Sequence, residues 1–549
     1  MWRVFKQILA GCLLTAIFTI VLFSGQVSSA DGFLWLRNIS YEVQTLCVDS
    51  WMQWAVIACL VTHFVIFLLV QRRISLAESW WRWSNAELWL CGLIMLALLH
   101  YVFDHKTAAN ATRLFILLSG IVLGKGAALV ARWPGAKFGS HSPIGVERDG
   151  SGRVWGIIFV LLLLLAAASW HPATAMEFQY RGQPRWRGLW NNPNLFGLFM
   201  GTGIALAFGL AVSSVEQPSL RFGSPKSRAS RASEAEKWMM ILGKWVIVVL
   251  CLVAAILMGC GLMHSYSRGA WMATFCGLGY LAFQVFKCQA SGSSKAEISC
   301  PSCVSWLKNN WLPAGVIFLS VVVLSFWHFR QTAWRPAHRA FSMGNQNDFS
   351  WRNRVAAWEG DLQMMAEKPW FGFGWNQPEP LYEYYYLPPK TIESAAVEMN
   401  DCLMLGATLG IPALFCFGTY LWLSLAQTPN LKWGACPPWA QFSAPSRKTS
   451  DAQESSNASR HSNMPEAGRE ARPATPEAGV IPAPDETISE FPTQSMELET
   501  TQVYWLRTTC RAGAIVLLVG FWFDGGLFKL ATASMFWILL ELGWPDQRR

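Results

Sequence analysis

Arginine residues recur beside the long apolar runs of this sequence, at places where they could form one anion-binding site. Arg187 lies in segment 171–193 and Arg354 in segment 329–398, each between two apolar runs. Arg268 stands in a connection between apolar runs that is too short for an ordinary loop. The planar guanidinium fork binds phosphate oxygens bidentately, so a cluster of these groups would suit a pyrophosphate. Simpler roles stay open, because Arg268 could extend to the membrane surface or pair with a carboxylate, and Arg354 could form a surface ion pair.

The composition indicates which elements must position these arginines. Hydrophobic residues make up 52% of the 549 residues, charged residues 14%, and the mean hydropathy is +0.26. About a quarter of the residues of a soluble globular enzyme are usually charged, so that class is disfavoured, as is a wholly disordered chain. The apolar blocks are long enough to cross a bilayer, and the 31 Trp suit its interfaces. We therefore predict an all-α, polytopic membrane protein.

The apolar runs predict about 12 transmembrane helices. The first lies within residues 1–30, where a basic start and small residues before position 31 also fit a cleaved signal peptide. The others are expected at 51–70, 88–103, 114–131, 154–171, 194–213, 245–263, 269–286, 311–328, 399–425, 504–523 and 525–543.

The positive charges in the loops predict the orientation of these helices. Lys and Arg concentrate in alternate loops, for example within 132–153 and 221–237, so both termini are expected in the cytoplasm. This orientation puts Arg268 and the segments 171–193 and 329–398 on the outer face. Because positive residues outside oppose the insertion preference, we expect them to serve another purpose. The formal charge of +9 fits such loops and an anionic headgroup better than nucleic acid.

The chain divides into four predicted parts. Residues 1–150 are expected to form N-terminal transmembrane helices, and 151–425 a membrane core that includes an outer loop at 329–398. Residues 426–503 are rich in Pro, Ser, Ala and Glu, which predicts a disordered cytoplasmic loop. Residues 504–549 hold the C-terminal transmembrane helices.

The cysteines give little sign of a metal centre. The 14 Cys are scattered, and many lie inside apolar runs, where they behave as small hydrophobic residues. Cys300 and Cys303 have the spacing of a metal-binding pair, but no second pair of Cys or His lies nearby. We predict no metal and no cofactor.

Five short motifs resemble those of the O-antigen ligase/polymerase family, in the same order and on the same membrane sides. They are RGLWNNPN at 187–194, YSRGAW at 266–271, RVAAW with KPWFGFG at 354–358 and 368–374, NDCL with LGIP at 400–403 and 409–412, and FDG at 523–525. The resemblance covers roughly residues 150–425 and 504–543.

The resemblance implies a bacterial inner-membrane glycosyltransferase of the GT-C type. Such enzymes take a glycan from a polyprenyl-pyrophosphate carrier, such as undecaprenyl pyrophosphate, and transfer it to lipid A core, another glycan or a protein hydroxyl in the periplasm. By the matching motifs, Arg187, Arg268 and Arg354 would hold the pyrophosphate in place of a metal. Asn194 and Asn400 are further candidate substrate-binding residues, and a simpler role stays open for the asparagines at 191, 192 and 194, which could cap the helix that begins near residue 195. Transfer would proceed with inversion at the anomeric carbon.

One position departs from the family pattern. The family commonly has His immediately before the Asn of the NDCL motif, and this chain has Met399, whose thioether is no base at neutral pH. Glu398 or Asp401 could replace the imidazole if burial raises the carboxyl pKa, and His338 could fold back from the outer loop. These three are the candidate catalytic residues.

Alternative functions remain open at this point. A polymerase of the same family would differ only in its acceptor. A transporter of lipid-linked glycans would also bind pyrophosphate, but would favour internal repeats and ionisable groups at mid-membrane, and Lys125 is the main such group. A non-catalytic assembly protein is the third alternative, because the motif histidine is absent.

Overall fold

The computed structural model describes residues 85–103, 108–132, 151–170, 177–180, 183–190, 192–215, 234–291, 349–375, 400–426 and 493–544. Apart from the first residues of the helix at 493–524, these ranges belong to one compact unit, formed by residues 1–429 and 497–549. The predicted helices at 1–30, 51–70 and 311–328 lie outside the described residues.

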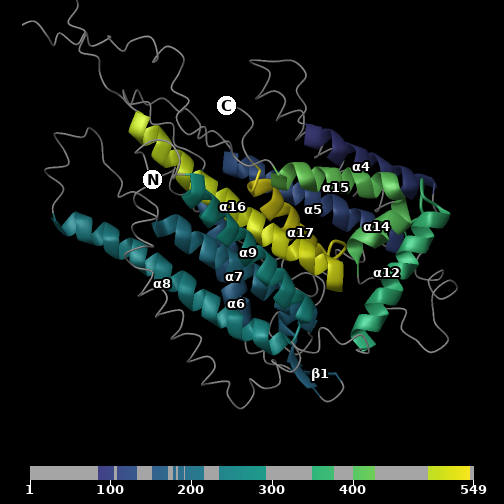
Figure 1. The fold of residues 1–549 in the computed structure, drawn as a ribbon, viewed down its shortest axis with the longest axis horizontal. Helices are drawn as coiled ribbons and strands as arrows, with labels where there is room; N and C mark the ends of the chain where they lie inside the picture. The colour runs from purple at the N-terminus through teal and green to yellow at the C-terminus, as the bar shows by residue number, and fades with distance from the viewer. Residues whose placement is uncertain are drawn as a thin grey trace, which may run out of the picture. The chain divides into compact units, whose positions relative to one another are not determined.

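The described part of the chain is almost entirely helical (Figure 1). Its helices are α4 (Asn85–Phe103), α5 (Ala108–Arg132), α6 (Ser151–Trp170), α7 (Pro193–Val215), α8 (Glu234–Ser265), α9 (Arg268–Ser291), α12 (Phe349–Glu367), α14 (Asp401–Leu409), α15 (Ile411–Ala426), α16 (Thr493–Asp524) and α17 (Leu530–Leu542). A hairpin of β1 (Glu177–Tyr180) and β2 (Gln183–Trp186) precedes a 3-10 turn, η2 (Gly188–Trp190).

Seven of the described helices are long and apolar enough to cross a membrane, namely α4 to α9 and α16, and α15 and α17 are shorter apolar helices. The predicted helical fold is confirmed for the described residues, and these apolar helices support the predicted membrane class. The predicted number of 12 concerns the whole chain and stays a prediction.

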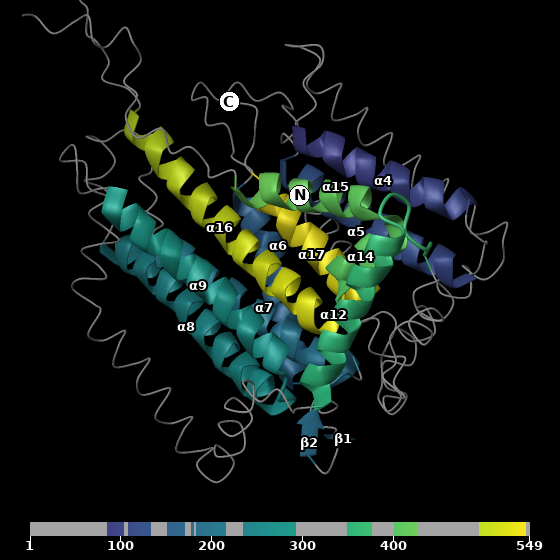
Figure 2. The same ribbon diagram turned by 45° about the vertical axis from the view of Figure 1, so that its right-hand side comes forward.

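Helix α7 is the centre of one group of helices. It packs against α6, α8 and α9 (Figure 2), and most of its apolar stretch is buried. Gly201 and Gly209 permit the close packing, since a Cβ at these positions would lie 2.0 Å from Thr274 Oγ1 and 2.1 Å from Thr509 Oγ1. Membrane helices commonly associate through small residues of this kind. A second group pairs α5 with α17 and α4 with α15.

The predicted span at 399–425 is wrong as one continuous helix, because Gly410 divides it into α14 and α15. Gly410 has φ of +86°, and a Cβ there would lie 2.4 Å from the carbonyl oxygen of Trp370. Residues 368–374 bind along this break: the backbone N–H groups of Phe373 and Gly374 donate to the carbonyls of Ala407 and Thr408, at 2.9 Å each. The break therefore satisfies backbone groups of both segments, as a membrane protein requires.

Two further features differ from the sequence prediction. The all-α expectation missed the β1–β2 hairpin, whose register pairs Phe178 with Arg185. Helix α16 begins at Thr493, inside the segment predicted to be a disordered loop. Because a turn follows α16, α17 begins at Leu530, later than the predicted start at residue 525. The remainder of the predicted loop, 427–492, lies outside the described residues.

Candidate functional site

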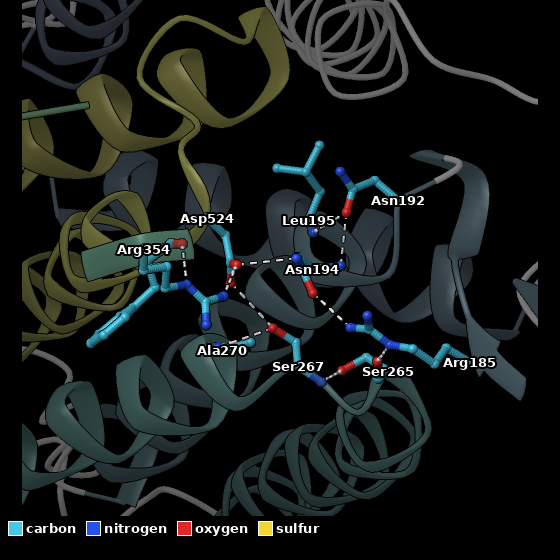
Figure 3. Close-up of polar contacts among 10 residues, drawn as sticks. Arg185, Asn192, Asn194, Leu195, Ser265, Ser267, Ala270, Arg354 and Asp524 are labelled. Carbon is cyan, nitrogen blue, oxygen red and sulfur yellow. Dashed lines mark hydrogen bonds and ion pairs between the residues drawn. The ribbon is translucent and has the colours of Figure 1, made fainter. Parts of the chain in front are cut away.

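The ends of four helices meet around a polar cluster (Figure 3). Asn194 is the second residue of α7, and Ser267 immediately precedes α9. Ser265 ends α8 and Asp524 ends α16, while Arg354 reaches the cluster from α12. Residues far apart in sequence are thus brought to one end of the bundle.

Asp524 is the centre of this cluster. Its Oδ1 accepts a hydrogen bond from Arg354 Nη2 at 2.6 Å and from Asn194 Nδ2 at 3.0 Å, and its Oδ2 accepts from Ser267 Oγ at 3.4 Å. Arg354 Nε also donates to the carbonyl of Phe523 at 2.9 Å. The Arg354 and Asp524 side chains are only 10% and 6% exposed, so their ion pair is largely shielded from solvent. The negative end of the α16 dipole also stabilises a cation at this position.

Arg185 extends the cluster to the end of α8. Its Nη2 donates to Asn194 Oδ1 at 2.6 Å and its Nε donates to the Ser265 carbonyl at 2.8 Å. Asn194 therefore joins Arg185 to Asp524, and Asp524 joins Asn194 to Arg354. We call Arg185, Asn194, Asp524 and Arg354 the polar chain. Its two guanidinium groups and one carboxylate give it a net charge of +1.

The Ser-Arg-Gly segment fits closely against Asp524. Ser267 Oγ accepts from the backbone N–H of Ala270 at 3.3 Å and so caps α9, while Tyr266 adopts a φ of +50° in the turn before it. A Cβ at Gly269 would lie 2.6 Å from Asp524 Oδ2. Only glycine allows this approach without displacement of the carboxylate.

The sequence predicted that Arg187, Arg268 and Arg354 bind the ligand. Arg354 is part of the polar chain, and Arg268 is the half-buried first residue of α9, directly after Ser267. Arg187 is half-buried between β2 and η2, two residues after Arg185. All three therefore belong to segments that contribute to, or adjoin, the polar chain.

Asn400 caps helix α14. It is fully buried, and its Oδ1 accepts from the backbone N–H groups of Cys402 and Leu403 at 3.1 Å each. Its Nδ2 is buried without a hydrogen-bond partner among the described residues. The capping bonds explain why Asn stands at the start of this helix. Capping at α7 is performed by Asn192, whose Oδ1 accepts from the backbone N–H of Asn194 at 2.9 Å.

Of the three candidate catalytic residues, the structure describes Asp401. This carboxylate is 3% exposed, and its Oδ2 accepts from the backbone N–H groups of Gly526 at 2.5 Å and Leu527 at 2.6 Å. Asp401 therefore holds the turn that follows Asp524. Glu398 and His338 lie outside the described residues.

A second buried carboxyl group lies on α12. Asp361 is 1% exposed and stands seven residues, or about two helical turns, after Arg354. Burial raises the pKa of the Asp361 carboxyl well above its usual value, and the negative charge of Asp401 raises it further.

An aromatic pair borders the polar chain next to Arg185. Trp186 stacks on His264 with ring centroids 4.2 Å apart and an interplanar angle of 17°. His264 Nδ1 lies 2.9 Å from the Cys260 carbonyl, which orients the ring at the end of α8. Flat aromatic surfaces of this kind can pack against sugar rings.

The sequence prediction missed two residues of the polar chain. Arg185 stood in the same basic segment as Arg187, and Asp524 stood in the FDG motif, so both had a signal. Asp361 had no signal beyond its charge, because its burial depends on how α12 packs against α14.

Comparison with known protein families supports one assignment. Residues 253–418 match the family model described as O-antigen ligase, which confirms the resemblance found in the sequence. The matched range contains Ser267, Arg268, Arg354 and Asn400. A search of curated proteins gives no match.

Proposed function

Since residues 253–418 match the O-antigen ligase family model, we propose that the protein transfers a glycan from a polyprenyl-pyrophosphate carrier to an acceptor at the periplasmic face of the bacterial inner membrane. The observation that carries this proposal is the polar chain, in which Arg354 and Asn194 bind the anionic group of Asp524 and Arg185 binds the other end of the Asn194 amide. The donors that bind the Asp524 carboxylate are of the type that binds phosphate oxygens.

The arginines would bind the diphosphate of the donor. Arg354 supplies a guanidinium from α12, and Arg268 and Arg187 stand on adjoining segments, with Asn194 between the two arms of the polar chain. The N-terminus of α9 adds backbone N–H groups and the positive end of its dipole. As the glycosidic bond breaks, charge grows on the leaving pyrophosphate, and fixed guanidinium groups stabilise that charge.

Transfer would proceed by inverting displacement at the anomeric carbon. A bond forms between the acceptor oxygen and that carbon while its bond to the pyrophosphate oxygen breaks on the opposite face. The proton of the acceptor hydroxyl passes to a base, for which Glu398, Asp401 and His338 are our candidates. The series E398Q, D401N and H338A should contain one variant with near-total loss of transfer, and full activity in all three would exclude this set.

The sugar would be held by groups beside the polar chain. The stacked pair of Trp186 and His264 offers an aromatic face, and Asn400 Nδ2 offers a donor at the start of α14. The acceptor distinguishes a ligase, which uses lipid A core, from a polymerase, which uses another repeat.

Deletion of the gene, followed by gel analysis of surface glycans, tests the proposed function. We expect loss of glycan attached to lipid A core for a ligase, and single-repeat glycan for a polymerase. Complementation with R268A or R354A should reduce transfer by about two orders of magnitude at normal membrane levels. R153A is the matched control, because Arg153 makes an exposed hydrogen bond to the Val130 carbonyl. Normal surface glycan in both test variants would contradict the proposal.

A further inference from the structure

Asp361 has an environment that an ionised carboxylate could hardly tolerate. Its side chain is 1% exposed, and neither carboxyl oxygen has a hydrogen-bond partner among the described residues. A buried charge without a partner is strongly unfavourable, and such a group usually remains neutral instead. Asp361 lies on the same helix as Arg354, and that helix packs against α14.

Besides burial, the negative charge of Asp401 raises the pKa of Asp361. Asp401 comes from α14, the helix that packs on α12, and it must be an acceptor because it binds the backbone N–H groups of Gly526 and Leu527. Two adjacent carboxyl groups cannot both ionise at low cost in a buried site. If one of them holds a proton, it is therefore Asp361.

Among the side chains that the structure describes, the other charged and titratable groups on the neighbouring elements do not compensate Asp361. They are Arg354, Glu359, Glu367 and Lys368 on or next to α12, Cys402 on α14, and Asp524 and Lys529 at the turn after α16. The guanidinium of Arg354 binds Asp524 and the Phe523 carbonyl, and Glu359, Glu367 and Lys368 are exposed.

We propose that Asp361 is a positioning residue of the transfer site, and that as an uncharged acid it allows Asp401 to stay ionised and hold the turn after α16. That turn begins at Asp524, so the position of the turn determines how the Asp524 carboxylate faces Arg354. The part of this inference that concerns glycan transfer rests on the proposed function. Its claim about the turn stands on the contacts alone.

The sign of the pH dependence follows from these contacts. An Asp in the unfolded chain has a pKa of about 3.9, and burial raises the pKa of Asp361 in the folded protein. The folded state therefore binds the proton more tightly. Its contribution to stability is complete below the unfolded pKa and is lost as the pH rises through the folded pKa.

The test compares D361N with the wild type and with E359Q, using the full chain in mixed micelles titrated with SDS. Asparagine resembles the protonated acid, so D361N should lack the titration, while E359Q removes an exposed acid of the same helix. Above about pH 4, the unfolding equilibrium constant of the wild type should rise relative to D361N by up to about tenfold per pH unit. Parallel pH profiles of the wild type and D361N, or the same change in E359Q, would overturn the proposal.

A second variant keeps the test decisive if D361N does not fold. D401N removes the neighbouring negative charge, so the alkaline loss of stability should span a narrower pH range than in the wild type. An unchanged range would refute the coupling of the two carboxyl groups.

Transfer activity separates a positioning role from direct proton transfer. D361N should retain transfer at neutral pH and should not share the fall in transfer that the wild type shows as Asp361 ionises. Near-total loss of transfer in folded D361N would assign Asp361 to the chemistry and overturn the positioning role. If the wild type shows no transfer at all, the proposed function fails, while the unfolding profiles still decide the role of Asp361.

Discussion

The ion pair between Arg354 and Asp524 permits a quantitative prediction of stability. The two side chains lie 2.6 Å apart and are 10% and 6% exposed, so solvent screens their attraction little. Removal of one partner leaves the other buried and uncompensated, which typically costs about 3–5 kcal/mol. R354A also removes the hydrogen bond to the Phe523 carbonyl, and bonds from charged donors contribute about 1.5–3 kcal/mol.

A double-mutant cycle isolates the pair. We expect R354A and D524A each to lower the free energy of unfolding by about 3–5 kcal/mol. The double variant should lose less than the sum of the two by about 1–3 kcal/mol, because neither charge is then left alone. The assay is SDS titration of the full chain in mixed micelles, with unfolding followed by tryptophan fluorescence.

A matched control shows that the effect is specific to the pair. R153A removes an arginine whose hydrogen bond to Val130 is exposed, so its free energy of unfolding should stay within about 0.5 kcal/mol of the wild type. Additive losses for R354A and D524A would show that the two side chains do not interact, and the reasoning from the polar chain would be refuted.

Two other substitutions test the packing that the structure reveals. G269A places a methyl group 2.6 Å from Asp524 Oδ2 and should reduce transfer by about 100-fold. G279A, on the same helix, should retain transfer, because a Cβ there meets no neighbouring atom of the described residues within 4 Å, and equal rates of the two variants would contradict this. K125M removes the cation 2.9 Å from the buried Glu541 carboxylate and should lower the free energy of unfolding by about 3–5 kcal/mol, which SDS titration would measure. An unchanged unfolding midpoint would contradict that role.

Much of the membrane fold was predictable because its signal is local. Runs of apolar residues of sufficient length predicted the helices from α4 to α9 and α16, with ends that differ by a few residues in most cases. Helix α8 begins earlier, at Glu234, because its polar first turns extend beyond the apolar run. Apolar length identifies the part of a helix that can lie in lipid and does not define its polar ends.

The break at Gly410 was not predictable from the apolar pattern, which continues across it. It depends on the backbone of residues 368–374, which binds α14 from a distant part of the sequence. The β1–β2 hairpin is similar, because strands of four residues are too short for a periodic signal.

The candidate site was only partly predictable. The motif at 187–194 pointed to the correct segment, but the contacts to Asn194 and to the Ser265 carbonyl belong to Arg185. Arg185 and Arg187 are close in sequence and of the same type, so the sequence alone does not indicate which of them binds these partners. Asp361 likewise has no sequence signal that sets it apart from other acidic residues, because its burial arises from the packing of α12.

The central claim is that Arg354 of the polar chain and Arg268 beside it bind a diphosphate. Its most direct test is the binding of glycan-free polyprenyl diphosphate, compared with polyprenyl monophosphate, to the full chain in nanodiscs. We predict tighter binding of the diphosphate by the wild type, and a loss of that preference in R268A and R354A. Equal binding of the two lipids by the wild type, or an unchanged preference in both variants, would contradict the account.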